Sequence, residues 1–322
     1  MIKPTYTVGY LVFREVEVTN ANAISGQLIY GVPQLSALLG AFHSMSRKLS
    51  KQDPLQLTDG YLDGVMVICH ECDVDALRTN PYKDYTFNQS KSVPNNKTDY
   101  SKFSNESAPS IIEEGRCRIV MSFVVEVRAS GEFSNEQKDL LRKQAARVLQ
   151  TQPLAGGQVT HFSDIDNRIL FVESEDLEDI AFSLPSGYAL MDASEELTSI
   201  VEDKADDSYT ALDALIDVCS IHFTPTINDD NETEWSMHKI GHPNQLSPIA
   251  IGFQGISHLY EAGEMQECRK PNNKSQYVET IYGLGKWVLP HVLRLDDELK
   301  NAFWRYDYQA KSNLYLISQN TN

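Results

Sequence analysis

The sequence predicts an α+β fold of the ferredoxin-like type, with a long inserted segment and a small acidic helical insertion. Two observations support this prediction. Strand-like and helix-like segments follow one another in the order strand, helix, strand, strand, helix, strand, which is the βαββαβ motif. The chain has 322 residues and 41% hydrophobic composition, enough to bury a sizeable core. RNA-recognition modules share this order of elements.

The first three elements are predicted within the first 70 residues. Residues 6–18 are rich in β-branched and aromatic side chains, which favour a strand, and a polar loop follows at residues 19–26. Pro33 opens a helix that runs to about Leu49, because its apolar residues recur on one face at helical spacing. Residues 63–70 alternate as a second strand.

A long insertion separates these elements from the third strand, the second helix and the fourth strand. Residues 116–128 alternate between apolar and polar side chains and form the clearest strand. Ser134 and Gln137 have the spacing of a capping box, which predicts a helix to about Gln150. The segment 154–159 leads into a fourth strand. Further elements are expected as a helix at residues 210–221 and strands at residues 277–287 and 314–318.

Residues 74–112 have little apolar periodicity and interleave cations with aromatic rings. Such a pattern suits a flexible clamp over single-stranded RNA, and a mobile surface loop would have the same composition. The residues concerned are Lys83, Lys91, Lys97 and Lys102 with Tyr82, Tyr85, Phe87, Tyr100 and Phe103. We divide the chain into a body of residues 1–192 that contains this 74–112 insertion, an acidic helical insertion of residues 193–234, and residues 235–322, which complete the body.

The net charge of −17 opposes nucleic-acid binding, but the acidity is local. Residues 161–234 contain twenty acidic and two basic residues, whereas the rest of the chain contains 25 acidic and 26 basic residues. The near-neutral remainder can carry a basic groove. A solvated face that keeps the protein soluble explains the acidic block on its own.

No common catalytic or metal-binding pattern is present. The sequence lacks GxSxG, HExxH and GxxxxGK motifs, and the single CxxC of Cys69 and Cys72 has no second pair at zinc-finger spacing. His238 and His242 are four apart, but Gly241 and Pro243 oppose the helix that such a metal pair needs. We therefore expect no metal, no cofactor and no enzymatic activity.

The five scattered cysteines fit reduced thiols, and no apolar run is long enough to span a membrane, so we expect a cytoplasmic protein without membrane contact. The alternative to a binding protein is a metal-independent endoribonuclease that uses His43 with Tyr30 or Arg47. A histidine at the edge of the core is the simpler interpretation of His43.

Two glycine pairs can allow close approach of a ligand to the backbone. Gly156 and Gly157 follow a predicted helix, and Gly283-Leu284-Gly285 precedes Lys286 and Trp287. Lys286 would supply a phosphate-binding cation beside the stacking surface of Trp287, with His291 and Arg294 shortly after.

Several motifs along the chain closely resemble one protein family, the second Csy subunit, which is the Cas-five-type RAMP of type I-F CRISPR complexes. They span nearly the whole sequence and are specific together. They are Asn20-Ala21-Asn22-Ala23-Ile24-Ser25, Gly31-Val32-Pro33, Phe42-His43 with Arg47-Lys48, Ile112-Glu113-Glu114-Gly115-Arg116, Leu154-Ala155-Gly156-Gly157, Leu184-Pro185-Ser186-Gly187-Tyr188-Ala189-Leu190, Leu212-Asp213-Ala214-Leu215, Tyr282-Gly283-Leu284-Gly285-Lys286-Trp287, Pro290-His291 and Trp304-Arg305-Tyr306.

The resemblance implies a ferredoxin-like RAMP body, a thumb-like hairpin at residues 74–112 and a glycine-rich loop that contacts RNA. It also implies a non-catalytic subunit that grips the 5′ handle of CRISPR RNA, pairs with the large Csy subunit and abuts the terminal backbone Csy subunit. Contact with target DNA near the flanking motif is left open. The expected RNA-binding residues are Asn20, Asn22, Ser25, Arg47, Lys83, Lys91, Lys97, Arg116, Gly156, Gly157, Gln158, Lys286, Trp287, His291 and Arg294.

The acidic residues 161–234 depart from what the resemblance implies. They could dock a basic face of the large subunit or discourage off-register binding of nucleic acid. A third hypothesis is therefore a scaffold that binds only proteins through its acidic block.

Overall fold

The computed structural model describes residues 6–51, 61–91, 111–160, 164–204, 208–227, 232–239, 246–266, 268, 270–295 and 298–319. Its helices are α1 (Leu35–Leu49), α2 (Asn135–Gln150), α3 (Ile165–Arg168), α4 (Leu177–Ser183), α5 (Ser194–Lys204), α6 (Ala211–Cys219) and α7 (Pro290–Leu295), with 3-10 turns at Ser174–Asp176 and Leu299–Ala302. The strands are β1 (Tyr6–Asn22), β2 (Tyr61–Val74), β3 (Ala76–Leu77), β4 (Thr86–Lys91), β5 (Ile111–Glu114), β6 (Arg116–Ala129), β7 (Gln158–Val159), β8 (Ile169–Glu173), β9 (Tyr188–Asp192), β10 (His222–Ile227), β11 (Thr233–His238), β12 (Leu246–Gly255), β13 (Val278–Val288), β14 (Arg305–Gln309) and β15 (Leu314–Ser318).

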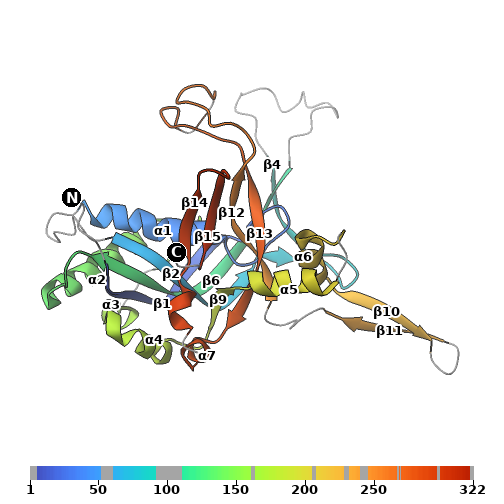
Figure 1. The fold of residues 1–322 in the computed structure, drawn as a ribbon, viewed down its shortest axis with the longest axis horizontal. Helices are drawn as coiled ribbons and strands as arrows, with labels where there is room; N and C mark the ends of the chain where they lie inside the picture. Colours follow the sequence, from blue (N-terminus) through green and yellow to red (C-terminus); the bar gives the residue numbers. More distant parts are fainter. Residues whose placement is uncertain are drawn as a thin grey trace.

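A ten-stranded sheet forms the centre of the molecule, in the order β14-β15-β12-β13-β9-β2-β6-β1-β7, with β8 also paired to β1 (Figure 1). All of its strand pairs are antiparallel. The described part of the chain is therefore a mixed structure of helices and mostly antiparallel sheet, in agreement with the predicted α+β class. Strand β9 joins the two halves, because it pairs with β2 on one side and with β13 on the other.

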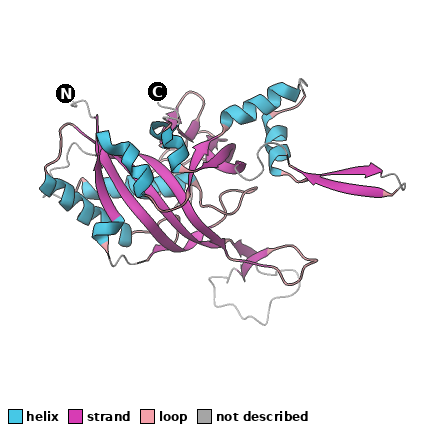
Figure 2. Cartoon of the chain, turned by 90° about the horizontal axis from the view of Figure 1, so that it is seen from below, coloured by secondary structure: helices cyan, strands magenta, loops and turns pink. Residues whose placement is uncertain are grey.

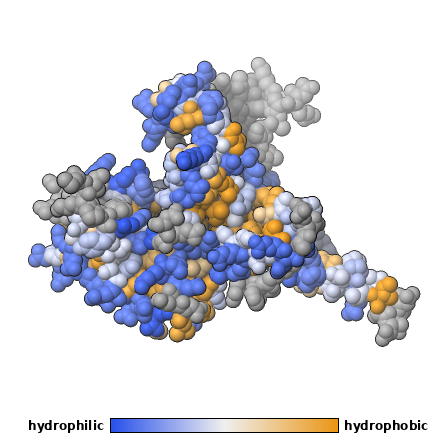
Figure 3. Space-filling view, viewed as in Figure 1, coloured by the Kyte–Doolittle hydropathy of each residue, from blue (hydrophilic) through white to orange (hydrophobic). Residues whose placement is uncertain are grey.

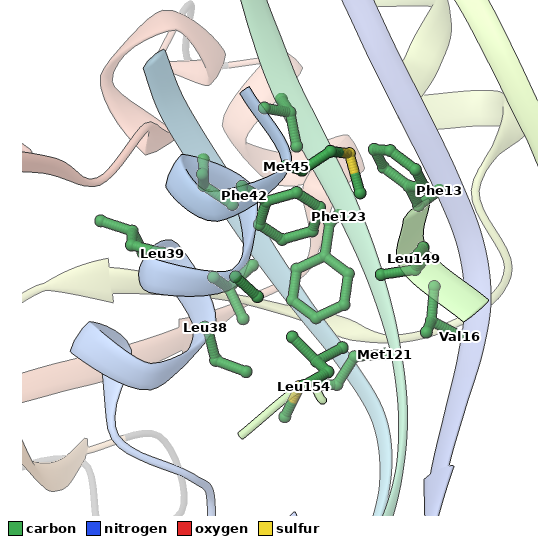
Figure 4. Close-up of a cluster of buried hydrophobic side chains, with 14 of the residues drawn as sticks. Phe13, Val16, Leu38, Leu39, Phe42, Met45, Met121, Phe123, Leu149 and Leu154 are labelled. Atoms are coloured by element: carbon green, nitrogen blue, oxygen red, sulfur yellow. The ribbon is translucent and has the colours of Figure 1, made fainter. Parts of the chain in front are cut away.

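Helices α1 and α2 cover one face of the N-terminal half of the sheet and enclose the largest core (Figure 4). The predicted apolar stripe of α1 is buried against the alternating apolar face of β6, so that the ring centroids of Phe42 and Phe123 lie 5.0 Å apart. The predicted capping box also forms: the backbone N–H of Gln137 donates to Ser134 Oγ, and the N–H of Ser134 donates to Gln137 Oε1. The start of α2 is thus fixed locally.

The opposite face of the sheet is covered by α4, α7 and the 3-10 turn at Leu299–Ala302, around a second apolar cluster. Here Tyr10 of β1 stacks on Phe303, with ring centroids 5.5 Å apart. A buried ion pair lies nearby: Arg305 Nη2 is 2.7 Å from Glu126 Oε2, and the N–H of Gly64 donates to the same oxygen. These contacts attach the C-terminal strand β14 to β6 and β2.

Three elements differ from the sequence prediction. Strand β1 runs to Asn22, so Asn20 and Asn22 lie in a strand and not in the predicted loop. Asn22 continues the ladder with β6, and Asn20 lies in the bulge just before it. Residues 74–112 contain β3, β4 and the first half of β5. These strands form a small sheet that prolongs β2 and β6, and polar strands of this kind have no apolar alternation to reveal them. The fourth strand is β8, since the segment 154–159 contributes only the two-residue β7.

The acidic helical insertion of residues 193–234, called the acidic segment from here on, contains more than the predicted helix. Helices α5 and α6 pack on β12 and β13 through Leu215, Val218 and Leu284. A hairpin of β10 and β11 then projects from α6 away from the body (Figures 1 and 2). The expected boundary between residues 234 and 235 falls inside β11, since both halves of the hairpin belong to one unit. Among the described residues, no helix combines the length and apolar character needed to cross a bilayer.

Candidate nucleic-acid interface

One end of the β1–β6 pair brings several predicted residues together. Asn22 is the Cα partner of Arg116 in the antiparallel ladder, so both side chains lie on the same face of the sheet. Asn20 and Asn22 are exposed, and Arg116 is half-buried. Asn20 has a φ of 61°, a left-handed conformation that Asn tolerates better than most residues. The bulge between Val18 and Ala21 therefore turns this polar end of β1 outward.

The turn at residues 154–157 packs directly against this end of β1. The N–H of Asn22 donates to the carbonyl of Ala155, and Thr19 pairs with Gln158. A Cβ on Gly157 would lie 2.5 Å from the carbonyl oxygen of Thr19, so only glycine fits there. Gly156 has a φ of +78° and is exposed, and a Cβ on it would lie 3.9 Å from the Cβ of Asn22. Gly157 is thus a packing residue, and Gly156 and Gln158 form the accessible surface.

The electrostatics of this end depend on Arg116. Its neighbour on the same strand face, Arg118, is held by Glu17, Glu71 and Asp73 at 2.7, 2.7 and 3.4 Å, and hydrogen bonds to these carboxylates raise the pKa of its guanidinium further. Arg116 forms no ion pair with any residue that the structure describes. Within the described part of the chain, the charge of Arg116 is therefore available to an anionic ligand, whereas that of Arg118 is already neutralised.

Ser25 does not present its side chain to a ligand. It is 5% exposed, and its hydroxyl donates to the carbonyl of Val32 at 2.6 Å. Its backbone N–H donates to the carbonyl of Ile29. The predicted role of Ser25 in contacting RNA is therefore corrected: it closes the loop between β1 and α1 and fixes the position of the neighbouring exposed residues.

The base of the thumb-like insertion contacts that loop. The ring of Tyr30 meets Phe87 of β4 edge-on with centroids 5.3 Å apart. A Cβ on Gly115 would lie 2.5 Å from Ile24 Cγ1, which shows how closely the loop and β5 approach. Beyond this contact, the turn that carries exposed Lys83 is held by Arg78, whose guanidinium donates to the carbonyls of Pro81 and Lys83. The insertion is thus attached to the same end of the sheet as Asn22 and Arg116.

Two tyrosines of this insertion are exposed. Tyr82 is 98% exposed. The guanidinium of Arg78 lies over the ring of Tyr85, with its Cζ atom 5.5 Å from the ring centroid. Lys91 ends β4, and nothing is described of its side chain; Lys97 lies outside the described residues. Of the predicted clamp, the structure therefore places the side chains of Lys83, Tyr82, Tyr85 and Phe87.

The glycine-rich segment before Trp287 is not a loop. Gly283 and Gly285 lie within β13, where a Cβ on either would meet the side chain of Ile251 or Ile249 at 3.0 to 3.1 Å. Because side chains alternate along a strand, Lys286 and Trp287 point to opposite faces. The prediction of a cation beside a stacking ring is therefore wrong in its geometry.

The two faces of β13 give these residues different surroundings. Lys286 is half-buried against α5 and lies 3.2 Å from Glu196. Trp287 packs against the main core and lines a small, mostly apolar pocket with Ser25, Tyr30, Pro33 and Gln34. Lys286 is therefore engaged with the acidic segment, and only Trp287 remains near the loop between β1 and α1.

Three other predicted residues lie apart from this end of the sheet. Arg47 is exposed one turn after His43 on α1, on the side that faces Tyr306 of β14. Arg294 of α7 lies over the ring of Phe182 and 3.6 Å from Glu178, both on α4. His291 is exposed on the same short helix, which Figure 1 places at the lower edge of the body, away from β4.

For the catalytic alternative, the described residues around His43 form no constellation of reacting groups. His43 is exposed, and its ring meets Tyr306 edge-on, not Tyr30; it forms no hydrogen bond with any described residue. A Ser–His contact does exist elsewhere, with His70 Nε2 2.7 Å from Ser122 Oγ. Ser122 is fully buried and also accepts from the N–H of Glu15, so this contact holds the sheet together and is closed to substrate.

Metal binding finds no support in the described residues. No group of three or more His, Cys, Asp or Glu side chains comes together there in a form that could hold an ion. Burial raises the pKa of the Cys69 thiol to about 12, which disfavours the thiolate that a metal requires. His242 lies outside the described residues.

Sequence reasoning missed two residues of this interface, Tyr30 as a contact of the thumb and Arg78 as the residue that fixes its turn. Arg78 had a local signal, since it precedes Pro81 and Tyr82 at turn spacing. Tyr30 had none, because its partner Phe87 is 57 positions away in the chain.

Comparison with known proteins points to one family. Residues 11–317 match the model of the family described as CRISPR-associated protein (Cas_Csy2). The chain is also 26% identical over 327 residues to the CRISPR-associated protein Csy2 of Pseudomonas aeruginosa (strain UCBPP-PA14), and this match covers 96% of the chain and 94% of that protein. The similarity therefore extends over the body, the thumb-like insertion and the acidic segment alike.

Proposed function

Because the chain belongs to the Cas_Csy2 family of CRISPR-associated proteins, we propose that it is a non-catalytic, guide-RNA-binding subunit of a type I-F CRISPR surveillance complex in the cytoplasm. It caps the 5′ handle of the guide with the end of the sheet formed by Asn20, Asn22, Arg116, Gly156 and Gln158. In the complex it pairs with the large Csy subunit and abuts the terminal backbone Csy subunit. The strand order β8-β1-β6-β2 supports a ferredoxin-like RAMP body.

One observation carries this proposal. The guanidinium of Arg116 forms no ion pair with a described carboxylate, and it lies beside exposed amide side chains and a glycine turn. Single-stranded RNA is bound through phosphate contacts, hydrogen bonds to base edges and stacking on aromatic rings. Arg116 supplies the cation, Asn20 and Gln158 supply donors and acceptors, and the exposed backbone at Gly156 allows close approach. Asn22 supplies the donor and acceptor capacity that its two hydrogen bonds with the backbone of Ile24 leave over. Tyr82 and Tyr85 of the thumb supply exposed rings.

The charge distribution supports recognition inside an assembly and not by the isolated chain. A net charge of −17 repels phosphate over a distance of about 10 Å at 0.1 M salt, so the free protein should bind RNA weakly. Neighbouring subunits that neutralise the acidic segment would remove this penalty. Guide retention should therefore depend on the complete complex.

Reconstitution with altered guides tests this function. The chain is co-expressed with the other subunits of its complex and with a guide that has either its natural 5′ handle or a scrambled handle of equal length and composition. We expect at least tenfold less of this chain per particle with the scrambled handle. Equal occupancy with both guides would contradict handle recognition, and shortened guide or repeat RNA after long incubation with the purified chain would contradict a non-catalytic role.

A further inference from the structure

The hairpin of β10 and β11 has one apolar and one polar face, and both are exposed. The ladder pairs Phe223 with Met237 and Pro225 with Trp235. Directly opposed residues share a face, and successive pairs alternate between faces. These four side chains therefore lie on one face together with Ile227, whose partner is Thr233.

The other face of the same hairpin is polar and satisfies its own contacts. It holds His222 and His238, whose rings stack with centroids 5.5 Å apart, and the pairs Thr224–Ser236 and Thr226–Glu234. Ser236 Oγ donates to the carbonyl of Thr224, and Thr226 Oγ1 donates to the carbonyl of Glu234. This face fixes the register of the hairpin and needs no partner.

The apolar face is open to solvent along its length. Phe223, Trp235, Met237 and Ile227 are 60%, 62%, 67% and 74% exposed. Figures 1 and 2 show the hairpin extending away from the body, and Figure 3 shows hydrophobic surface near its outer end. Single exposed apolar residues are common on protein surfaces, but five on one face of a projecting element mark an interaction site. A two-stranded hairpin is also marginally stable in water without such packing.

The charge around the hairpin indicates what covers it. The hairpin extends from α5 and α6, which carry Glu195, Glu196, Glu202, Asp203, Asp213 and Asp217 against Lys204. Nucleic acid would be repelled by this field, and a second copy of the chain would bring the same acidic charge to the contact. A protein whose apolar groove is bordered by Lys and Arg complements both features.

We propose that the apolar face of the β10–β11 hairpin docks into a groove on a protein subunit of its own complex, and that this groove is apolar with a basic border. The proposal rests on membership of a multi-subunit complex, as proposed above, but not on recognition of the handle. Trp235 and Phe223 are the anchors, since large aromatic side chains at the centre of a contact contribute most of its binding energy. The acidic helices behind the hairpin steer the approach.

The first test compares two sets of substitutions in the assembled particle. Phe223→Thr, Trp235→Thr and Met237→Thr remove the apolar face while keeping strand-forming residues; Thr224→Ala, Thr226→Ala and Ser236→Ala truncate the same number of side chains on the polar face as the control. Native mass spectrometry measures the amount of each variant per guide. We expect at least tenfold weaker incorporation for the apolar-face set and less than twofold for the control. Equal losses in both sets, or none in either, would overturn the proposal.

The second test identifies the occupant. A photoreactive phenylalanine analogue at position 235 is activated in the purified particle, and hydrogen exchange of residues 222–238 is compared between free chain and particle. We expect crosslinks to a protein subunit at a peptide containing Lys or Arg, and exchange at least tenfold slower in the particle. Crosslinks to RNA or to a second copy of this chain, or equal hydrogen exchange in the free chain and the particle, would refute docking of the hairpin on a protein subunit. Handle recognition is read separately from the scrambled guide, so either proposal can fail alone.

Discussion

Asn22 and Arg116 lie directly opposite each other at the end of the β1–β6 ladder, and the N–H of Asn22 is bound to the carbonyl of Ala155 in the glycine turn. Asn22 and Arg116 are 94 positions apart in the chain, and Arg116 and Ala155 are 39 positions apart, yet all three form one surface. The base of the thumb borders this surface through the contact of Tyr30 with Phe87. This relationship is the basis of the proposed handle site.

Arg116→Ala should weaken guide retention by about tenfold or more, because a charge-assisted hydrogen bond to phosphate contributes about 1.5–3 kcal/mol. The slope of log affinity against log salt should also become shallower by about 0.7 for each phosphate that is no longer neutralised. Binding is measured by filter retention of labelled guide across salt concentrations. Lys311→Ala, an exposed cation on the turn between β14 and β15, is the matched control and should leave both values unchanged. Identical behaviour of the two variants would argue against Arg116 as a phosphate-binding residue.

Tyr82→Ala should reduce guide affinity without changing the stability of the chain, since its side chain is 98% exposed. Loss of one base stacked on an aromatic ring costs about 1–3 kcal/mol. Affinity is measured in the reconstituted particle, and stability by urea unfolding of the free chain. Tyr308→Ala on β14, also an exposed tyrosine, should retain full affinity. Equal affinities of Tyr82→Ala and wild type would remove this ring from the clamp.

Glu126→Gln should lower the free energy of unfolding by about 3 kcal/mol, because removing one member of a buried ion pair leaves Arg305 without a counter-charge. Glu17→Gln is the control: Glu17 is half-exposed and shares Arg118 with two other acids, so its loss should cost less than about 1 kcal/mol. Urea unfolding at neutral pH measures both. A difference below about 1 kcal/mol between the two variants would show that the Glu126–Arg305 pair does not hold β14 to the body.

Stability should fall at alkaline pH because of Tyr10. Burial, followed by the nearby carboxylate of Glu126, raises the pKa of Tyr10 to about 12 from an ordinary value of 10.0. Its protonated form therefore stabilises the fold fully below pH 10, and this contribution is lost as pH rises towards 12. Tyr10→Phe cannot ionise, so its unfolding free energy should decline less than that of wild type between pH 10 and 12. Parallel curves for the two proteins in urea unfolding would contradict this account.

The body of the fold could be predicted from the sequence wherever one face of an element is apolar. The alternation in β6 and the stripe on α1 reveal the core, and Ser134 with Gln137 marks the start of α2. The sheet of β3, β4 and β5 and the polar end of β1 could not be found in this way, because their residues are mostly exposed and carry no apolar alternation. Backbone pairing defines them instead, between neighbouring segments in β3, β4 and β5 and between distant segments in β1 and β6.

The site was predictable in its residue types and only in part in its geometry. Asn22, Arg116 and Gly156 come together as the motifs indicated, whereas Lys286 is engaged by Glu196 and Ser25 is buried. Both errors have the same cause: a short motif does not show which face of a strand or loop each side chain takes, and strand alternation separates neighbours such as Lys286 and Trp287.

Photocrosslinking of the guide in the assembled particle tests the handle site most directly. A 4-thiouridine is placed at each handle position in turn, and the crosslinked peptides are identified by mass spectrometry. We predict crosslinks to peptides that contain residues 19–30, 82–87, 116 and 155–158 of this chain. Handle crosslinks that fall only on α7 or on the face of β13 that carries Lys286, or only on other subunits, would contradict the proposed handle site.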